Sequence, residues 1–232
     1  MASDDIVQPP PGHLRLDTAQ ATGRVIANFA WQHLRAAALF RQHLVRIETE
    51  HAGQEFSAFF EDIRSYASAC IMSAAASLEA FINELFIAHN SKLRAQLKDF
   101  EAEFWGKGGI ERWPILDKYQ HALSMLQAPC FDERAPPYRE AWGLIELRNA
   151  LVHYKPTWDP ERQRQAELAE VLMDRFALSP FPDEGADFVT MKCMSAGCGT
   201  WAISTVIALI TEFDARTSLD PKKVAAFRKL GT

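Results

Sequence analysis

Apolar residues recur every three to four positions along most of the chain, the spacing that places them on one face of an α-helix. The first stripe runs from Ile26 to Ile47 and predicts a long helix that begins at a cap, Asp17 or Thr18, and ends near His51. Nowhere does a strand pattern alternate with a helix pattern. We therefore expect an all-α fold, an up-down helical bundle.

The rest of the pattern divides into helices separated by glycine and proline. Residues 54–89 are predicted to form a second long helix, and small side chains in its middle, residues 67–77, place it at the centre of the bundle. Residues 187–191 are predicted to be a short extended piece. Further helices are predicted over residues 91–105, 114–126, 138–154, 161–176 and 195–216, and from Asp220 on.

The composition is that of a globular chain. With 232 residues, 48% of them hydrophobic and 24% charged, it is long enough to enclose a core. Residues 1–16 predict a disordered tail, and residues 17–232 a single helical domain. The tail does not look like a signal peptide, and the four cysteines lack metal-ligand spacing. We expect a cytoplasmic protein that uses no metal and no other cofactor.

Residues 193–211 form an uncharged run that approaches the length of a membrane span. The run contains glycines and hydroxyl side chains, and it is strongly apolar only from Trp201 to Ile210. A buried core helix is the favoured interpretation, with no membrane contact. A membrane-associated helical protein is the weaker alternative.

Candidate chemistry is confined to one segment, because the common nucleotide-binding, zinc-protease and serine-hydrolase signatures are absent. Residues 144–156, with the sequence LIELRNALVHYKP, place Arg148, Asn149 and His153 near the end of a predicted helix. The bare spacing of arginine and histidine also occurs at Arg46 and His51, where the surrounding residues do not support it.

Residues 144–156 resemble the Arg-Asn-x-x-x-His motif of the HEPN superfamily. The resemblance includes the apolar residues between the asparagine and the histidine, the aromatic residue after the histidine and the proline that ends the helix. Residues 77–84, with the sequence SLEAFINE, also resemble members of this superfamily. The resemblance covers residues 54–154. It implies a HEPN-type bundle with additional N- and C-terminal helices. It also implies a metal-independent endoribonuclease, in some members a toxin or antiphage defence effector with an antitoxin or other partner protein.

The resemblance also implies roles for individual residues. The catalytic residues would be Arg148, Asn149 and His153, and the substrate-binding residues would be Glu79, Asn83, Tyr154 and Lys155.

Helical geometry bears on how such a site is assembled. Arg148 and His153 point about 140° apart on one helix, so one copy does not easily close both groups on the same phosphate. Two such helices meeting at a two-fold axis would surround one cleft, and we expect a homodimer that binds RNA. The 2′-hydroxyl of the RNA would attack the neighbouring phosphate, with histidine moving the proton and arginine binding the phosphate.

Other interpretations stay open. The net charge is −5, so RNA binding needs a local basic patch. Some toxin members carry a tyrosine two residues after the histidine, which the antitoxin modifies; here Tyr154 is adjacent and Lys155 holds that place.

Glu79 and Asn83 could form an interhelical hydrogen bond instead of acting at the site. The alternative function is a non-catalytic helical scaffold for protein or nucleotide binding. Candidates for the basic patch are Arg139, Arg148, Lys155, Arg162 and Arg164.

Overall fold

A computed structural model describes residues 28–88, 91–154 and 163–230. Within these ranges all regular structure is helical and no strand occurs, which confirms the predicted all-α class. The tail expected at residues 1–16 lies outside the described residues, as does the predicted cap at Asp17 or Thr18.

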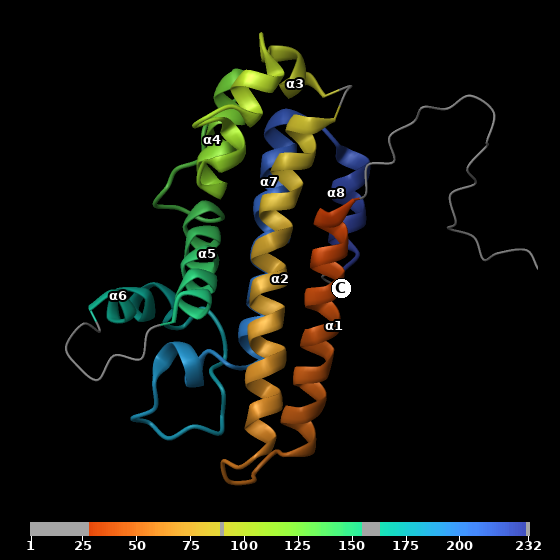
Figure 1. The fold of residues 1–232 in the computed structure, drawn as a ribbon. Coiled ribbons are helices and arrows are strands. Elements are labelled where there is room, and N and C mark those ends of the chain that lie inside the picture. Colours follow the sequence, from red (N-terminus) through yellow and green to blue (C-terminus); the bar gives the residue numbers. More distant parts are fainter. Residues whose placement is uncertain (1–27, 89–90, 155–162, 231–232) are drawn as a thin grey trace, which may run out of the picture.

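The described α-helices are α1 (Phe29–Glu50), α2 (Phe59–Ile87), α3 (Lys92–Gln96), α4 (Ile115–Met125), α5 (Tyr138–Val152), α6 (Gln163–Leu172), α7 (Ala196–Thr217) and α8 (Pro221–Arg228). Two short segments of π- and 3₁₀-type, η1 (Glu101–Trp105) and η2 (Ile110–Arg112), lie between α3 and α4, and a π-type segment, η3 (Phe188–Lys192), lies between α6 and α7. The long helices α1, α2 and α7 run side by side, with α8 next to α1 and with α4 and α5 on the other side of α2 (Figure 1).

The small residues of α2 let α1 and α7 approach it closely, as the sequence predicted. The Ser77 hydroxyl donates to the Ala30 carbonyl oxygen on α1 at 2.7 Å, and the Cys70 thiol donates to the Ala37 carbonyl oxygen at 3.3 Å. On α7, a Cβ at Gly199 would lie 3.2 Å from the Cys70 sulfur. Larger side chains at these positions would push the three helices apart.

Carboxylates from neighbouring helices cap two of the long helices. The first N–H groups of a helix lack intrahelical partners and carry partial positive charge. Glu84 on α2 accepts a hydrogen bond from the Ala30 backbone N–H at 2.9 Å and forms an ion pair with Lys223 on α8. Glu48 on α1 accepts from the Ala196 N–H at 2.8 Å, and its burial raises the pKa of that carboxyl group.

In the described part of the chain, α1 begins at a local cap. Asn28 is its cap, because its side chain accepts a hydrogen bond from the Trp31 N–H at 3.1 Å. Phe29, which we expected in the buried stripe, is 57% exposed at this end. A local Asn cap therefore determines where α1 starts.

Two other local predictions were wrong. The helix predicted over residues 91–105 breaks after Gln96, and Asp99 accepts from the Ala102 N–H at 3.1 Å to start the separate η1 segment. The extended piece predicted at residues 187–191 is helical, because Asp187 accepts from the Thr190 N–H at 2.7 Å and starts η3. In both cases an aspartate carboxylate accepts a hydrogen bond from a backbone N–H at the start of the segment, which apolar spacing does not reveal.

Two of the described helices, α2 and α7, are long and apolar enough to span a membrane by length and composition. Their most apolar windows are 56% and 61% buried within the bundle, where the two helices pack against each other. Core helices of soluble proteins have the same properties, so this is weak evidence for a membrane span.

Candidate functional site

The motif Arg148, Asn149 and His153 lies at the C-terminal end of α5. Arg148 and Asn149 belong to the last part of the helix, and His153 follows it as the C-terminal cap. The His153 backbone N–H donates to the Asn149 carbonyl oxygen at 2.9 Å, which closes the last turn. The imidazole therefore stands at the point where the chain leaves the helix.

The motif faces outward from the core. His153 and Tyr154 are exposed, and Arg148 and Asn149 are half-buried. The Asn149 amide donates to a Glu146 carboxylate oxygen at 3.3 Å, and Glu146 makes a further interaction besides. Arg148 has no hydrogen-bond or ion-pair partner among the described residues. Among the described residues, Arg148 therefore has no partner that a phosphate would have to displace.

The other two predicted polar residues, Glu79 and Asn83, belong to a different cluster. Both point from α2 to Lys118, a fully buried residue on α4. The Lys118 ammonium donates to the Asn83 side-chain oxygen at 3.0 Å and to the Glu111 carbonyl oxygen at 2.7 Å. It also lies 3.5 Å from a Glu79 carboxylate oxygen.

The two segments that resemble the HEPN superfamily are therefore not joined into one site in a single copy of the chain. The helices α2 and α5 pack against each other, but α2 also contacts α3 and α4, whereas α5 also contacts α6 and η3 (Figure 1). In the described part of the chain, no hydrogen bond or ion pair links Glu79 or Asn83 to Arg148 or His153. Lys155, the remaining predicted substrate-binding residue, lies outside the described residues.

Sequence reasoning missed Lys118, although the pattern held a signal for it. The buried positions of α4 are Ile115, Leu116, Tyr119, Ala122 and Leu123, and Lys118 falls within that stripe. A lysine on the apolar face of a helix needs a polar partner in the core, since an unpaired buried charge is costly. Glu79 and Asn83 on α2 are these partners, so both residues make the interhelical contact that was the alternative to a role in the site.

The predicted basic patch is only partly described. Arg139 lies over the Trp142 ring, with its guanidinium carbon 4.2 Å from the ring centroid. Lys155, Arg162 and the side chain of Arg164 lie outside the described part of the chain. Arg139 and Arg148 are thus the two members of the patch whose side chains are placed.

The cysteines and the second arginine–histidine pair have other local explanations. All four cysteines are free, and burial raises the pKa of the Cys70 thiol to about 12. Burial likewise raises the pKa values of Cys193 and Cys198. His51 stacks on Phe59 with ring centroids 4.0 Å apart. Among the described residues, no group of histidine, cysteine or carboxylate side chains is arranged to hold a metal ion.

Comparison with known proteins gives no relative: no family model, curated protein or solved structure matches the chain.

Proposed function

We propose that this chain is a HEPN-type, metal-independent endoribonuclease that acts as a homodimer in the cytoplasm. The observation that carries the proposal is the state of Arg148, which is half-buried and without a partner among the described residues. A guanidinium that is partly withdrawn from water gains most from an anionic ligand, and its planar fork matches a phosphate. His153 stands exposed five residues further on, at the end of the same helix.

The chemistry follows from these two groups. His153 would take the proton of the RNA 2′-hydroxyl while the 2′-oxygen forms a bond to phosphorus. The bond from phosphorus to the 5′-oxygen would break, and the 5′-oxygen would receive a proton from His153 of the second copy. Arg148 would stabilise the charge that develops on the phosphate oxygens. The products are a 2′,3′-cyclic phosphate and a 5′-hydroxyl.

The second copy is supported by the surface next to the motif. Val152 is 50% exposed and Tyr154 47% exposed, so two large apolar side chains stand in water beside His153. A symmetric contact through the end of α5 would bury them and bring two Arg148 and two His153 side chains around one cleft. The HEPN-type up-down arrangement of the helices belongs to the same proposal.

A non-catalytic scaffold for protein or nucleotide binding is the second candidate. The Lys118 cluster favours it, because Glu79 and Asn83 hold α2 to α4 rather than contacting the motif. In that case the exposed end of α5 would serve only to bind a partner.

Cleavage assays on matched RNA and DNA strands separate the two candidates. The wild-type chain should cleave single-stranded RNA and leave the same DNA sequence intact, since DNA lacks the attacking hydroxyl. His153→Ala should abolish cleavage. His51→Ala is the matched control, because His51 has the same spacing from an arginine but stacks on Phe59, and its loss should leave cleavage unchanged. Equal effects of the two substitutions, or no cleavage by the wild type, would leave only the scaffold.

A further inference from the structure

One face of α5 carries three polar side chains in a row. Spacings of three and four residues place Glu146, Asn149 and His153 within about 60° of one another around the helix, at ~100° per residue. His153 keeps the helical register, because its backbone N–H still donates to the Asn149 carbonyl oxygen at 2.9 Å. The three side chains therefore form a line that ends at the exposed imidazole.

The contact between Glu146 and Asn149 fixes which end of the amide points along this line. The Asn149 Nδ2 donates to a Glu146 carboxylate oxygen at 3.3 Å, and both side chains are half-buried. An ionised carboxylate only accepts hydrogen bonds, so it can hold the NH₂ end of an amide but not its oxygen. The Asn149 Oδ1, which accepts hydrogen bonds, is therefore turned away from Glu146.

The direction of helical side chains leaves that oxygen for His153. Side chains on an α-helix lean toward its N-terminus, so each one covers the turn before its own Cα. The imidazole of His153 thus leans back toward Asn149, whose Cβ atom is about 5–6 Å away at this spacing. Among the described residues the imidazole makes no hydrogen bond, so it can turn its Nδ1 to the Asn149 oxygen without breaking one.

A hydrogen bond of this kind decides where the imidazole carries its proton. Neutral imidazole has one N–H, and the partner of one nitrogen determines which nitrogen holds it. A bond from Nδ1–H to an amide oxygen leaves Nε2 unprotonated. A general base needs that form, because the atom that takes the proton has to be free of one. Asparagine orients a catalytic histidine in the Cys-His-Asn arrangement of papain-like proteases.

We propose that Glu146 and Asn149 are positioning residues that hold His153 as a general base with its proton on Nδ1. Glu146 would fix the Asn149 amide, and the Asn149 Oδ1 would accept from His153 Nδ1–H. The Nε2 atom would take the proton of the RNA 2′-hydroxyl while the 2′-oxygen bonds to phosphorus, and the leaving 5′-oxygen would be protonated as in the reaction above. This inference rests on the proposed function. It also changes the role of Asn149, which would act through His153 rather than on the phosphate.

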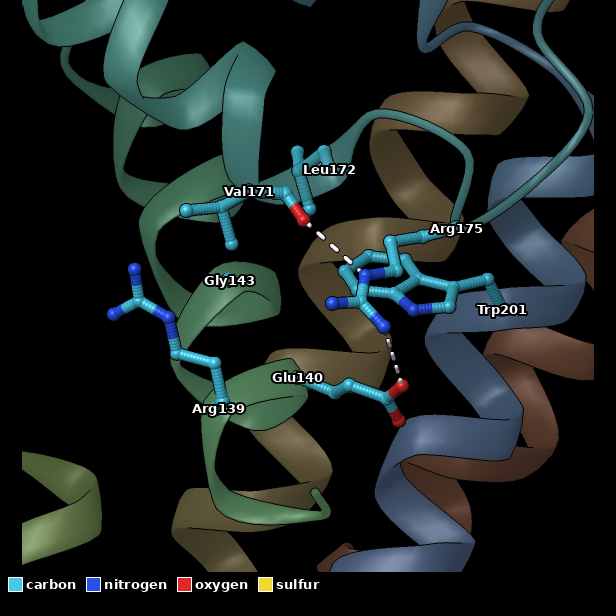
Figure 2. Close-up of a pocket in the computed structure, with 7 residues that line it drawn as sticks. All are labelled: Arg139, Glu140, Gly143, Val171, Leu172, Arg175 and Trp201. Carbon is cyan, nitrogen blue, oxygen red and sulfur yellow. Dashed lines mark hydrogen bonds and ion pairs between the residues drawn. The ribbon is translucent and has the colours of Figure 1, made fainter. Parts of the chain in front are cut away.

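The other carboxylate of α5 provides a matched control. Glu140 lies six residues before Glu146, on another face of the helix. Its carboxylate oxygen is 3.6 Å from the Arg175 guanidinium, and this pair lines a small hollow together with Gly143 and Trp201 (Figure 2). Glu140→Ala therefore removes a carboxylate from the same helix and leaves the line of side chains intact.

Nitrogen NMR of the imidazole reads the tautomer in the full-length protein without RNA. The His153 signals are assigned by their loss in His153→Ala, and spectra are recorded at about pH 9, well above the range in which imidazoles ordinarily titrate. The wild type should carry the proton mainly on Nδ1. Asn149→Ala and Glu146→Ala should move it mainly to Nε2, the form that an imidazole without a partner prefers. Glu146→Gln, which keeps an acceptor oxygen for the Asn149 amide, and Glu140→Ala should both preserve the wild-type tautomer.

Cleavage kinetics give a second readout that a merely structural role would not produce. Asn149→Ala should lower kcat about tenfold or more and leave KM within about twofold, because the lost interaction would act on the base and not on bound RNA. Glu146→Ala should lower kcat in the same way, and Glu146→Gln should recover most of the loss.

A wild-type imidazole with its proton mainly on Nε2 would overturn the proposal. So would a tautomer that Asn149→Ala and Glu146→Ala leave unchanged, or one that Glu140→Ala changes as much. A raised KM with unchanged kcat in Asn149→Ala would overturn it too, because Asn149 would then bind the RNA itself. The expected tautomers in a chain that never cleaves RNA would keep the positioning of His153 and refute only the proposed reaction.

Discussion

Replacing the buried Lys118 tests how α4 is held against α2. Lys118→Met keeps most of the aliphatic stem and removes the ammonium, so it isolates the polar contacts. The substitution removes two charge-assisted hydrogen bonds, to the Asn83 side chain and to the Glu111 carbonyl oxygen. Each such bond contributes roughly 1.5–3 kcal/mol, and the loss leaves its acceptor poorly solvated.

The expected cost of Lys118→Met is about 2–4 kcal/mol, because relief from burying the cation offsets part of the loss. The Glu79 contact adds little, since that carboxylate is 42% exposed and screened by solvent. Asn83→Ala should cost less than Lys118→Met, and Glu79→Gln least. Lys222→Met, on the exposed surface of α8, is the control and should change stability by less than about 0.5 kcal/mol.

Urea unfolding followed by circular dichroism measures these differences. At a slope of about 3 kcal/mol per molar urea, Lys118→Met should lower the midpoint by roughly 1 M. A shift no larger than that of Lys222→Met would refute the structural role of the cluster. If Asn83→Ala instead keeps full stability and loses RNA cleavage, Asn83 orients the catalytic groups, as the resemblance implies.

Three further predictions concern the end of α5 and the pH dependence of folding. Arg148→Ala should lower RNA cleavage by ~10²-fold or more, because it removes the group that stabilises the phosphate charge. It should change the free energy of unfolding by less than about 1 kcal/mol, because Arg148 has no partner among the described residues. A large loss of stability would show a structural role instead. Light scattering should give a dimer of the 26.1 kDa chain that Val152→Asp converts to a monomer, and an unchanged dimer would place the interface elsewhere. Burial lowers the pKa of the His121 imidazole below its ordinary 6.5. The stability that depends on a neutral His121 is therefore fully present above pH 6.5 and is lost as the pH falls through the lower pKa of the folded state. His121→Gln should therefore lose less stability than the wild type between pH 7.5 and 5.5 in urea titrations.

The sequence predicts the all-α class and the central position of α2, because both depend on apolar spacing and side-chain size. Cys70 and Ser77 are small residues in the middle of α2, and the structure buries both against neighbouring helices. The ends of the helices were less predictable. The side chains of Asn28, Asp99 and Asp187 each accept a hydrogen bond from a backbone N–H in the first turn of a helical segment, a signal that apolar periodicity does not contain.

The candidate site was predictable only where it is local in sequence. Arg148, Asn149 and His153 lie within six residues on one helix, so their exposure follows from the end of α5. The contacts of Glu79 and Asn83 depend on Lys118, which is 35 residues beyond Asn83. Trp201 and Arg175 line the same small hollow only because α7 and the segment after α6 lie against α5, and no short-range pattern shows that.

The ends of the RNA products test the central proposal most directly. Purified protein is incubated with a single-stranded RNA in excess EDTA, and the fragments are identified by mass spectrometry. If the 2′-hydroxyl attacks with the help of His153 and Arg148, fragments should end in 2′,3′-cyclic phosphate and carry 5′-hydroxyl groups, and His153→Ala should yield none. Fragments with 3′-hydroxyl and 5′-phosphate ends, or equal cleavage by His153→Ala, would contradict the account.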